Sequence, residues 1–263
     1  MTPGPLRSLL PTLFTSLTRQ HPASPSTSAT SSWTLLRTLK SENPDDIQGQ
    51  LRGTARFTPL RSSSSQTTRS QEQEQEQSQP QPQPQPQGSA QDLLYSEEGT
   101  LPHLQLPNMN FPAGLRWTKK YIWRLSSDGR ISVWFVRVDK RPGDKDRVEE
   151  GEGEEEADYL FHEFEFSDAD STQHIYSGHD SGTSEEEEFV TAPTPPEVFG
   201  SEGRRTRVIT ARGNHLCVND MYRTAYAFRV EEGSGEVVSW ASRHVVRGPR
   251  KAQDIVNLYS RTP

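Results

Sequence analysis

The chain has 263 residues, of which 30% are hydrophobic, and its single cysteine excludes an internal disulfide and a cysteine-based zinc site. No apolar run approaches the roughly 20 residues that a transmembrane helix needs, so no membrane span is predicted. The net charge of −7 is uneven: residues 139–202 hold 21 of the 36 acidic residues and 4 of the 29 basic ones. The remaining basic excess is spread along alternating strand positions, which favours a solvated strand face over nucleic-acid binding.

The first 41 residues contain no acidic residue, three arginines and many Ser and Thr. This composition is typical of a mitochondrial transit peptide, and we predict that residues 1–30 are a disordered or cleavable leader. The alternative to a transit peptide is a plain disordered segment before the fold. A third interpretation is a short amphipathic helix over LRSLLPTLFTSL that caps the fold, although Pro11 weakens a long helix there. We expect a cytoplasmic protein, with a mitochondrial location as the alternative.

Three further stretches lack the apolar side chains that a folded core requires. Residues 62–90 contain Gln-Glu and Gln-Pro repeats, residues 143–157 are an acidic run, and residues 168–203 contain EEEE and TAPTPPE. We predict that all three are disordered insertions in a single domain spanning residues 31–263. Without them about 150 residues remain, which is the size of one domain. In an alternative interpretation, the acidic and Gln/Pro-rich insertions recruit protein partners.

The ordered blocks alternate apolar and polar residues with the period of two that is typical of β-strands. In LRGTARF, Leu51, Gly53, Ala55 and Phe57 share one face. Residues 114–138 are predicted to form a hairpin around the turn SSDGR. The other strand-like runs are SSWTLLRTLK, DLLYSEE, YLFHEFEF, RRTRVITA, MYRTAYAFRVEE, EVVSWASRHVV and DIVNLYSR.

About ten short strands separated by turn signals favour one antiparallel sheet that closes on itself or packs as a sandwich. The small residues Gly53 and Ala55 on an inward face favour the closed form, because they let a strand bend or leave room inside. The sequence therefore predicts an all-β protein: a single antiparallel up-and-down β-barrel of about ten strands with long disordered loop insertions.

The order of the strand motifs is similar to that of a known family. The series is SWTLLRTL, LRGTARF, LLYSEEGTL, RWTKKYIWRL, ISVWF, YLFHEF, NHLCVNDMYRTAYAF, WASRHVVRGPRK and NLYSR. It resembles the domain of unknown function family 6314, which looks like a lipocalin-type (calycin) barrel. The family's H-x-C-x-x-D-x-Y pattern is present as His215, Cys217, Asp220 and Tyr222, whereas its usual aromatic residue shortly after GPRK is absent. The resemblance implies a fold and not a chemistry, because the family has no established activity.

Arg37 has two interpretations. Trp33 and Arg37 are similar to the Trp and Arg that close the base of lipocalin barrels, which would make Arg37 a structural residue. The alternative is that Arg37 anchors the carboxylate of a ligand. Tyr95 and Glu97 share a strand face, and Glu97 could pair with an inward arginine.

Polar residues on the strands form the candidate site. His215 and Cys217 point the same way along one strand, and His162 lies on the inward face of YLFHEFEF. If the strands that carry them pair, His162 and His215 approach each other, with His244 as a third candidate. Two histidines and a thiolate could hold a transition metal or contact a haem edge. Cys217 could instead be a nucleophile with His215 as its base, or these residues could simply anchor a turn and a strand by hydrogen bonds.

The function that we predict is the binding of one small apolar or amphipathic ligand inside the barrel, with no cofactor and no metal. The predicted ligand-binding residues are Arg37, Tyr121, His162, His215 and Tyr222. One alternative is an enzyme that uses His215 or His162 as a general base in the same cavity. Another is a solidly packed barrel that acts as an interaction protein through its insertions. The sequence names neither a catalytic residue nor a ligand.

Overall fold

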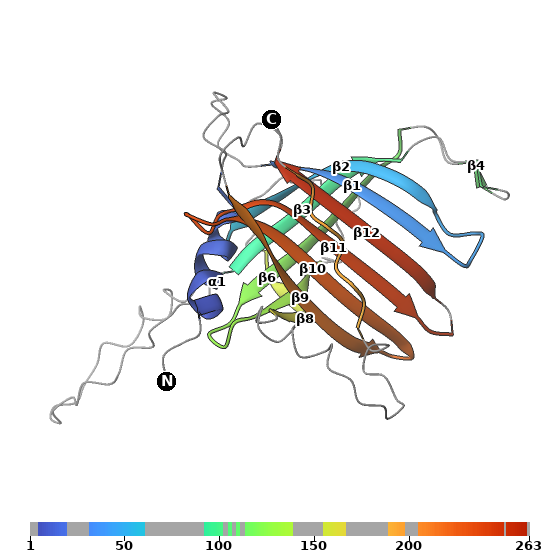
Figure 1. Cartoon of the computed structure of the whole chain (residues 1–263). Coiled ribbons are helices and arrows are strands. Elements are labelled where there is room, and N and C mark those ends of the chain that lie inside the picture. The colour runs from blue at the N-terminus through green and yellow to red at the C-terminus, as the bar shows by residue number, and fades with distance from the viewer. Residues whose placement is uncertain are drawn as a thin grey trace, which may run out of the picture.

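Ten strands close into one antiparallel barrel in the computed structural model of the chain, which confirms the predicted all-β fold (Figure 1). The structure describes residues 5–19, 32–60, 92–101, 105–106, 109–110, 114–138, 155–166, 189–197, 205–249 and 251–261. The barrel strands are β1 (Ser32–Ser41), β2 (Gly49–Pro59), β3 (Asp92–Thr100), β6 (Arg116–Leu125), β7 (Arg130–Val136), β8 (Ala157–Phe166), β9 (Thr206–Cys217), β10 (Asp220–Glu231), β11 (Val237–Arg247) and β12 (Ala252–Arg261).

The strands follow an up-and-down order around the barrel, and the pairing of β1 with β12 closes it. The short strands β4 (Gln105–Leu106) and β5 (Met109–Asn110) pair with each other outside the barrel, so β3 pairs directly with β6. The ladder between β8 and β9 has only two residue pairs, Glu165 with Arg212 and Phe166 with Ala211, whereas every other neighbouring pair in the barrel has at least five. The pairing between β8 and β9 is therefore the shortest in the barrel.

The alternation predicted for β2 places Leu51, Ala55 and Phe57 in the barrel interior, where all three are buried. Gly53, on the same face, has a packing role of its own. A Cβ atom at Gly53 would come within 2.3 Å of the Glu98 carbonyl oxygen on β3 and within 3.2 Å of the Trp117 ring. The small residue predicted to leave room inside the barrel therefore lets the backbone of β3 and a tryptophan from β6 approach β2 closely.

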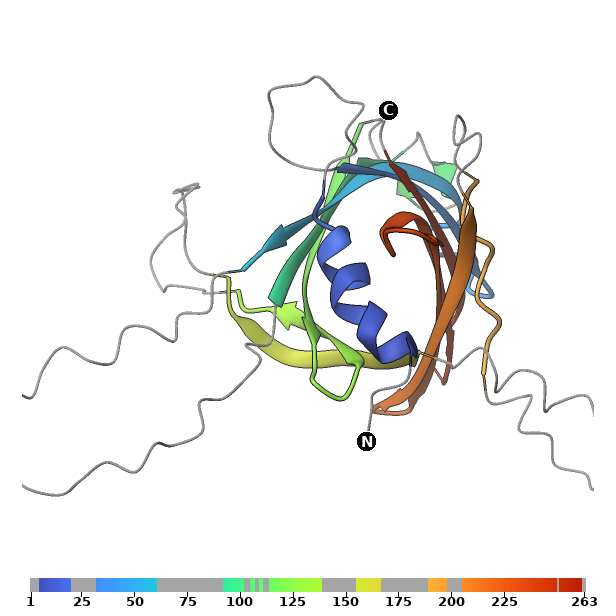
Figure 2. The ribbon, with the colours of Figure 1, turned by 60° about the vertical axis from the view of Figure 1, so that its left-hand side comes forward.

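One helix, α1 (Pro5–Ser16), closes one end of the barrel, and Figure 2 shows it lying across the barrel opening. Leu13, Phe14 and Leu17 are completely buried against the barrel core. Two hydrogen bonds join Ser16 of the helix to the last strands. The Val237 amide donates to Ser16 Oγ at 2.9 Å, and Arg261 Nη2 donates to the Ser16 carbonyl at 2.7 Å. No helix among the described ranges has the length and apolarity that crossing a membrane requires.

The helix replaces the disordered form of the predicted leader at residues 5–16 and matches the third interpretation, a helix that caps the fold. The cleavable form of that leader stays a prediction. The physical reason is that the apolar side of the helix fills the open end of the cylinder, which no local pattern in the leader reveals. Gly129 and Gly235, in the turns at this end, have positive φ angles of 88° and 72° and approach Leu10 and Leu9 of the helix. These two turns therefore form part of the surface on which α1 packs.

The interpretation in which Arg37 closes the base of the barrel together with Trp33 is wrong. The arginine that stacks on Trp33 is Arg261, whose guanidinium carbon lies 3.8 Å from the ring centroid. The indole Nε1 donates to the Leu17 carbonyl at 3.2 Å, so Trp33 belongs to the closed end under α1. Arg37 lies four residues further along β1, on the same face but towards the other end, and it faces the barrel interior.

Part of the third predicted insertion is an extended segment packed on the barrel. Residues 189–197 lie along the outside of β10 and β11, where the carbonyl groups of Pro195 and Pro196 accept hydrogen bonds from Arg229 at 3.2 and 3.3 Å. Ser239 Oγ also donates to the Pro196 carbonyl at 2.5 Å. A proline-rich chain is already extended and loses little entropy on docking, which explains this departure from disorder. Residues 62–90 and most of the other two predicted insertions fall outside the described residues.

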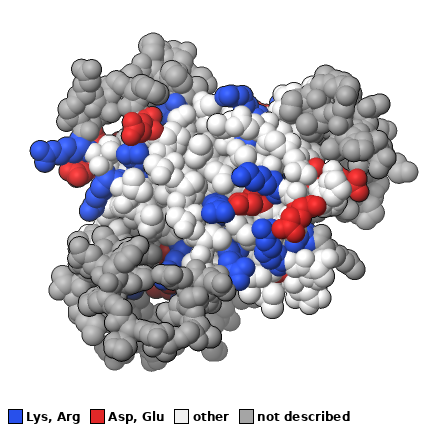
Figure 3. Space-filling model, turned by 45° about the vertical axis from the view of Figure 1, so that its right-hand side comes forward, with Lys and Arg blue, Asp and Glu red and all other residues white. Residues whose placement is uncertain are grey.

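The outer surface of the barrel carries interspersed charges of both signs. Acidic and basic side chains lie next to one another on the face seen in Figure 3. Ion pairs join neighbouring strands, as between Arg124 and Asp92 at 2.7 Å and between Arg243 and Asp254 at 2.7 Å. This pairing fits a solvated strand face; the absence of nucleic-acid binding stays a prediction.

Candidate ligand-binding site

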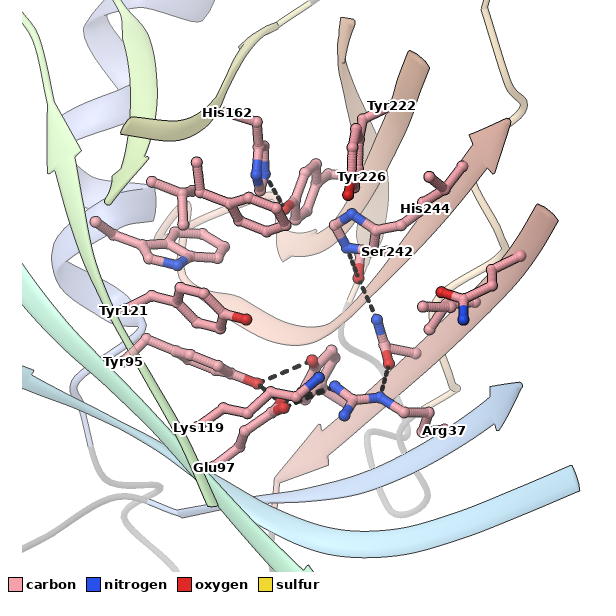
Figure 4. Close-up of a pocket in the computed structure, with 18 of the residues that line it drawn as sticks. Arg37, Tyr95, Glu97, Lys119, Tyr121, His162, Tyr222, Tyr226, Ser242 and His244 are labelled. Carbon is pink, nitrogen blue, oxygen red and sulfur yellow. Dashed lines mark hydrogen bonds and ion pairs between the residues drawn. The ribbon is translucent and has the colours of Figure 1, made fainter. Parts of the chain in front are cut away.

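The interior of the barrel contains a cavity of about 230 Å³ that opens to solvent (Figure 4). Its lining residues come from eight strands, so the cavity lies inside the barrel. The apolar and aromatic part of the wall consists of Tyr121, Trp123, Val133, Phe161, Trp240, Val246 and Ile255. The polar part includes an ion pair, two histidines and two lysines. The cavity therefore combines a large apolar surface with a few polar groups, as ligand sites in proteins generally do.

An ion pair between Arg37 of β1 and Glu97 of β3 lies in the wall of the cavity. Arg37 Nη2 donates to both carboxylate oxygens of Glu97 at 2.9 Å, and only 7% of Arg37 and 3% of Glu97 are exposed. Tyr95 also donates its hydroxyl to Glu97, at 2.5 Å. Burial acts to lower the pKa of Arg37, but the nearby carboxylate of Glu97 and the hydroxyls of Tyr259 and Tyr95 outweigh burial and raise it. The guanidinium is thus held charged inside the barrel.

A chain of hydrogen bonds extends from this ion pair across the cavity wall. Arg37 Nε donates to Asn257 Oδ1 at 2.6 Å, and Asn257 Nδ2 donates to Ser242 Oγ at 2.9 Å. Ser242 Oγ lies 3.2 Å from His244 Nε2. All of these groups come from the neighbouring strands β1, β12 and β11, whose register places them side by side. The network fixes the orientation of Arg37 and of His244.

Two histidines line the cavity: His162 is buried, with 2% of its surface exposed, and His244 is mostly buried. His162 Nε2 lies 2.7 Å from the Tyr226 hydroxyl, while its Nδ1 has no hydrogen-bond partner within the described part of the chain. Burial lowers the pKa of His162 well below its ordinary value of 6.5, and His244 and His215 add to the effect. Burial, with Arg37 and Lys119 nearby, lowers the pKa of His244 to about 3. Both imidazoles are therefore neutral near pH 7.

Lys119 of β6 is a lining residue that the sequence reasoning did not single out. It lies between Trp117 and Tyr121 on the inward face of β6, so the same period of two that identified those aromatics could have found it. Burial, followed by repulsion from Arg37, lowers the pKa of the Lys119 amine. In contrast, the sequence expectation that Glu97 pairs with an inward arginine is confirmed by the contact with Arg37.

Four of the five predicted ligand-binding residues line the cavity: Arg37, Tyr121, His162 and Tyr222. The fifth, His215, is not part of the lining. Its ring stacks on Tyr222 with centroids 4.7 Å apart and lies 6.1 Å from the ring of His162. His215 therefore packs against a residue of the cavity wall without lining the cavity itself. It does approach His162, as the sequence suggested.

The metal and nucleophile interpretations of the motif find little support. Cys217 is exposed at the end of β9, away from the cavity wall. Among the described residues, no group of three or more His, Cys, Asp or Glu side chains could hold a metal ion. At the rim of the cavity, Lys251 donates to the Tyr222 hydroxyl at 2.8 Å and lies 3.9 Å from Asp220 Oδ2. Asp220 and Tyr222 of the H-x-C-x-x-D-x-Y pattern thus position Lys251 at the rim of the cavity.

A family model described as a family of unknown function (DUF6314) matches residues 30–183 and 196–261. The chain belongs to this family. The DUF6314 match begins just before β1 and ends at the last residue of β12, so it contains every strand that lines the cavity. Helix α1 precedes the matched region. Comparisons with curated proteins and with solved structures found no match.

Proposed function

We propose that this DUF6314 barrel binds one small apolar or amphipathic molecule in its cavity. The observation that carries the proposal is the cavity of about 230 Å³ in the barrel interior, walled by aromatic side chains and by polar groups that the barrel holds in fixed positions. The buried Nδ1 of His162 adds support, because a buried polar atom without a partner is costly unless a ligand or a water satisfies it.

The size of the cavity sets the size of the ligand. An apolar protein cavity of roughly 150 Å³ is large enough to take up benzene. A cavity of about 230 Å³ therefore suits a single ring with a short substituent, or an aliphatic chain of similar volume. The stacked rings of Tyr121 and Phe161, whose centroids are 5.6 Å apart, offer a flat wall for such a ring.

The enzyme alternative has weaker support. A general base that works near pH 7 needs a pKa close to that pH. Burial and the neighbouring histidines lower the pKa of His162 well below 6.5, which makes its imidazole a poor proton acceptor. Burial also lowers the pKa of His215, and this residue does not line the cavity. Binding without turnover is the function that these values favour.

Native mass spectrometry of the protein purified from its own host tests the proposal. We expect a retained small molecule in the wild type. The Ile255→Trp variant, which fills the cavity, should lose this molecule. The matched variant Val256→Trp, on the outer face of the same strand, should keep it. A wild-type protein without any adduct, which also fails to take up small aromatic compounds added to it, would contradict the proposal.

A further inference from the structure

The charges around the cavity do not balance. Its lining contains three cationic side chains, Arg37, Lys119 and Lys251, and one acidic side chain, Glu97. Both lining histidines are neutral near pH 7, because burial lowers their pKa values. Lys251 at the rim has the Asp220 carboxylate at 3.9 Å. The imbalance therefore falls on Arg37, which is buried, and on Lys119, whose side chain lines the cavity but is partly exposed to solvent.

Glu97 cannot neutralise both of them. Its two oxygens already accept three hydrogen bonds, two from Arg37 and one from Tyr95. Within the described residues, no carboxylate lies within 4.0 Å of the Lys119 ammonium. Figure 4 shows Lys119 extending over Glu97 towards the Arg37 guanidinium. An ammonium and a guanidinium thus share one carboxylate at the cavity wall. Arg37 and Glu97 are buried there, whereas Lys119 keeps part of its side chain in solvent, so the positive charge that Glu97 leaves uncompensated is only partly removed from water.

We infer that Lys119 and Arg37 together bind the carboxylate of a small aromatic or aliphatic acid, whose apolar part lies against the aromatic wall. The inference rests on the proposed function and names its ligand class. The negative charge of the ligand supplies the charge that the site lacks. The Arg37 guanidinium is already oriented by Glu97 and Asn257, so it loses little freedom when the ligand binds.

The preference for charge is measurable with two probes of the same shape, trans-cinnamate and the neutral trans-cinnamamide. Trp123 and Trp240 line the cavity, so quenching of tryptophan fluorescence reports binding. In the wild type at pH 7, we expect cinnamate to bind about 10-fold more tightly than cinnamamide or better, because hydrogen bonds to charged groups in a shielded site are strong.

Lys119→Met removes the ammonium and keeps the length of the side chain. It should abolish most of the preference for cinnamate without weakening the binding of cinnamamide. The matched control is Lys120→Met, which removes the same charge on the outer face of the same strand, where Lys120 pairs with Glu155 at 2.5 Å. The control variant should keep the preference of the wild type.

The pH dependence of the wild type gives a second test that needs no variant. The preference for cinnamate should fall as the pH rises from 7 towards 10.5, because burial and Arg37 lower the pKa of Lys119 below its ordinary value of 10.5. Burial raises the pKa of Tyr121 to about 12 and also raises those of Tyr95 and Tyr259, so these three tyrosines stay neutral as Lys119 titrates. The hydrogen bond with Tyr222 raises the pKa of Lys251.

The outcomes separate the two proposals. Equal affinities of the wild type for cinnamate and cinnamamide, or a preference that survives Lys119→Met, would overturn the carboxylate inference while binding in the cavity stands. Failure of both probes to bind would contradict the proposed function as well. A preference that is lost in Lys119→Met, kept in Lys120→Met and weakened at high pH would support the inference.

Discussion

Arg37 and Glu97 form an ion pair that is almost completely buried, and its energetics differ from those of surface pairs. Removing one partner of such a pair leaves the other charge buried and costs about 3–5 kcal/mol. We therefore expect Glu97→Gln to lower the free energy of unfolding by about this amount, as measured by urea denaturation followed by tryptophan fluorescence. The control is Asp92→Asn, which breaks the partly exposed pair with Arg124 and should cost about 1 kcal/mol or less. Equal losses in the two variants would contradict the assigned role of Arg37 and Glu97.

The buried histidines predict a loss of stability in mild acid. In the folded state the pKa values of His162 and His244 lie below their unfolded value of 6.5, so the unfolded chain takes up protons first as the pH falls. The free energy of unfolding should therefore decrease below pH 6.5, by about 1.4 kcal/mol per pH unit for each buried histidine. For His244 this decrease continues down to its folded pKa of about 3.

Urea denaturation between pH 7.5 and 5 measures the effect above the range in which most carboxylates titrate. His244→Gln removes one titrating imidazole. It should therefore reduce the slope of the free energy of unfolding against pH by about 1.4 kcal/mol per pH unit. A free energy of unfolding that stays constant from pH 7 to 5 would show that these imidazoles are accessible to protons in the folded protein.

At the scale of single residues, the alternation of side chains predicted the inward positions of Tyr121 and His162, and the family resemblance pointed to Arg37 and Tyr222. It could not predict which inward residues meet across the barrel. Trp33 takes its arginine from β12, at Arg261, because β1 and β12 are neighbours only in the closed sheet. Lys119 was overlooked because a lysine in a strand with alternating basic residues looks like part of the solvated face.

Local sequence signals are not enough to predict helix α1. Twelve residues with an internal proline make a marginal helix in isolation, because short helices have a costly nucleus. The same mixture of leucine, arginine and serine is typical of a targeting sequence. The helix gains its stability from the barrel opening, and that opening exists only after the strands have closed.

We expect Leu13→Ala in α1 to lower the free energy of unfolding by about 2–5 kcal/mol, because Leu13 is completely buried at the closed end. The control is Arg7→Ala on the exposed side of the same helix, which should change it by about 0.5 kcal/mol or less. Urea denaturation of the full chain measures both. If Leu13→Ala is as stable as Arg7→Ala, the helix does not pack in the barrel end as described.

For the whole molecule, the count of about ten strands and the single barrel followed from the sequence alone. Periodicity fixed which face of each strand is buried, and the turn signals separated the strands. Closure was favoured by the small residues Gly53 and Ala55 and by the family resemblance, but no local pattern predicts the β1–β12 pairing, which joins the two ends of the domain. The cavity was also beyond the sequence, since its volume depends on how the rings of all the strands pack together.

Deletion of residues 62–90 tests the single-domain organisation. These residues connect β2 and β3, which are paired, and the Leu60 amide donates to the Asp92 carbonyl at 2.9 Å. A short Gly-Ser linker can therefore replace the insertion with little change in loop-closure entropy. We expect the shortened protein to keep its melting temperature within a few degrees, as measured by circular dichroism. An insoluble or molten product would show that the insertion contributes to the fold.

The central claim is that the interior of this barrel holds a small molecule, and a crystal structure of the protein grown with saturating trans-cinnamate tests it most directly. The account predicts electron density for one ligand inside the cavity, with its ring against Tyr121 and Phe161 and its carboxylate at Lys119 and Arg37. A cavity that contains only water, or that is filled by side chains, would contradict it.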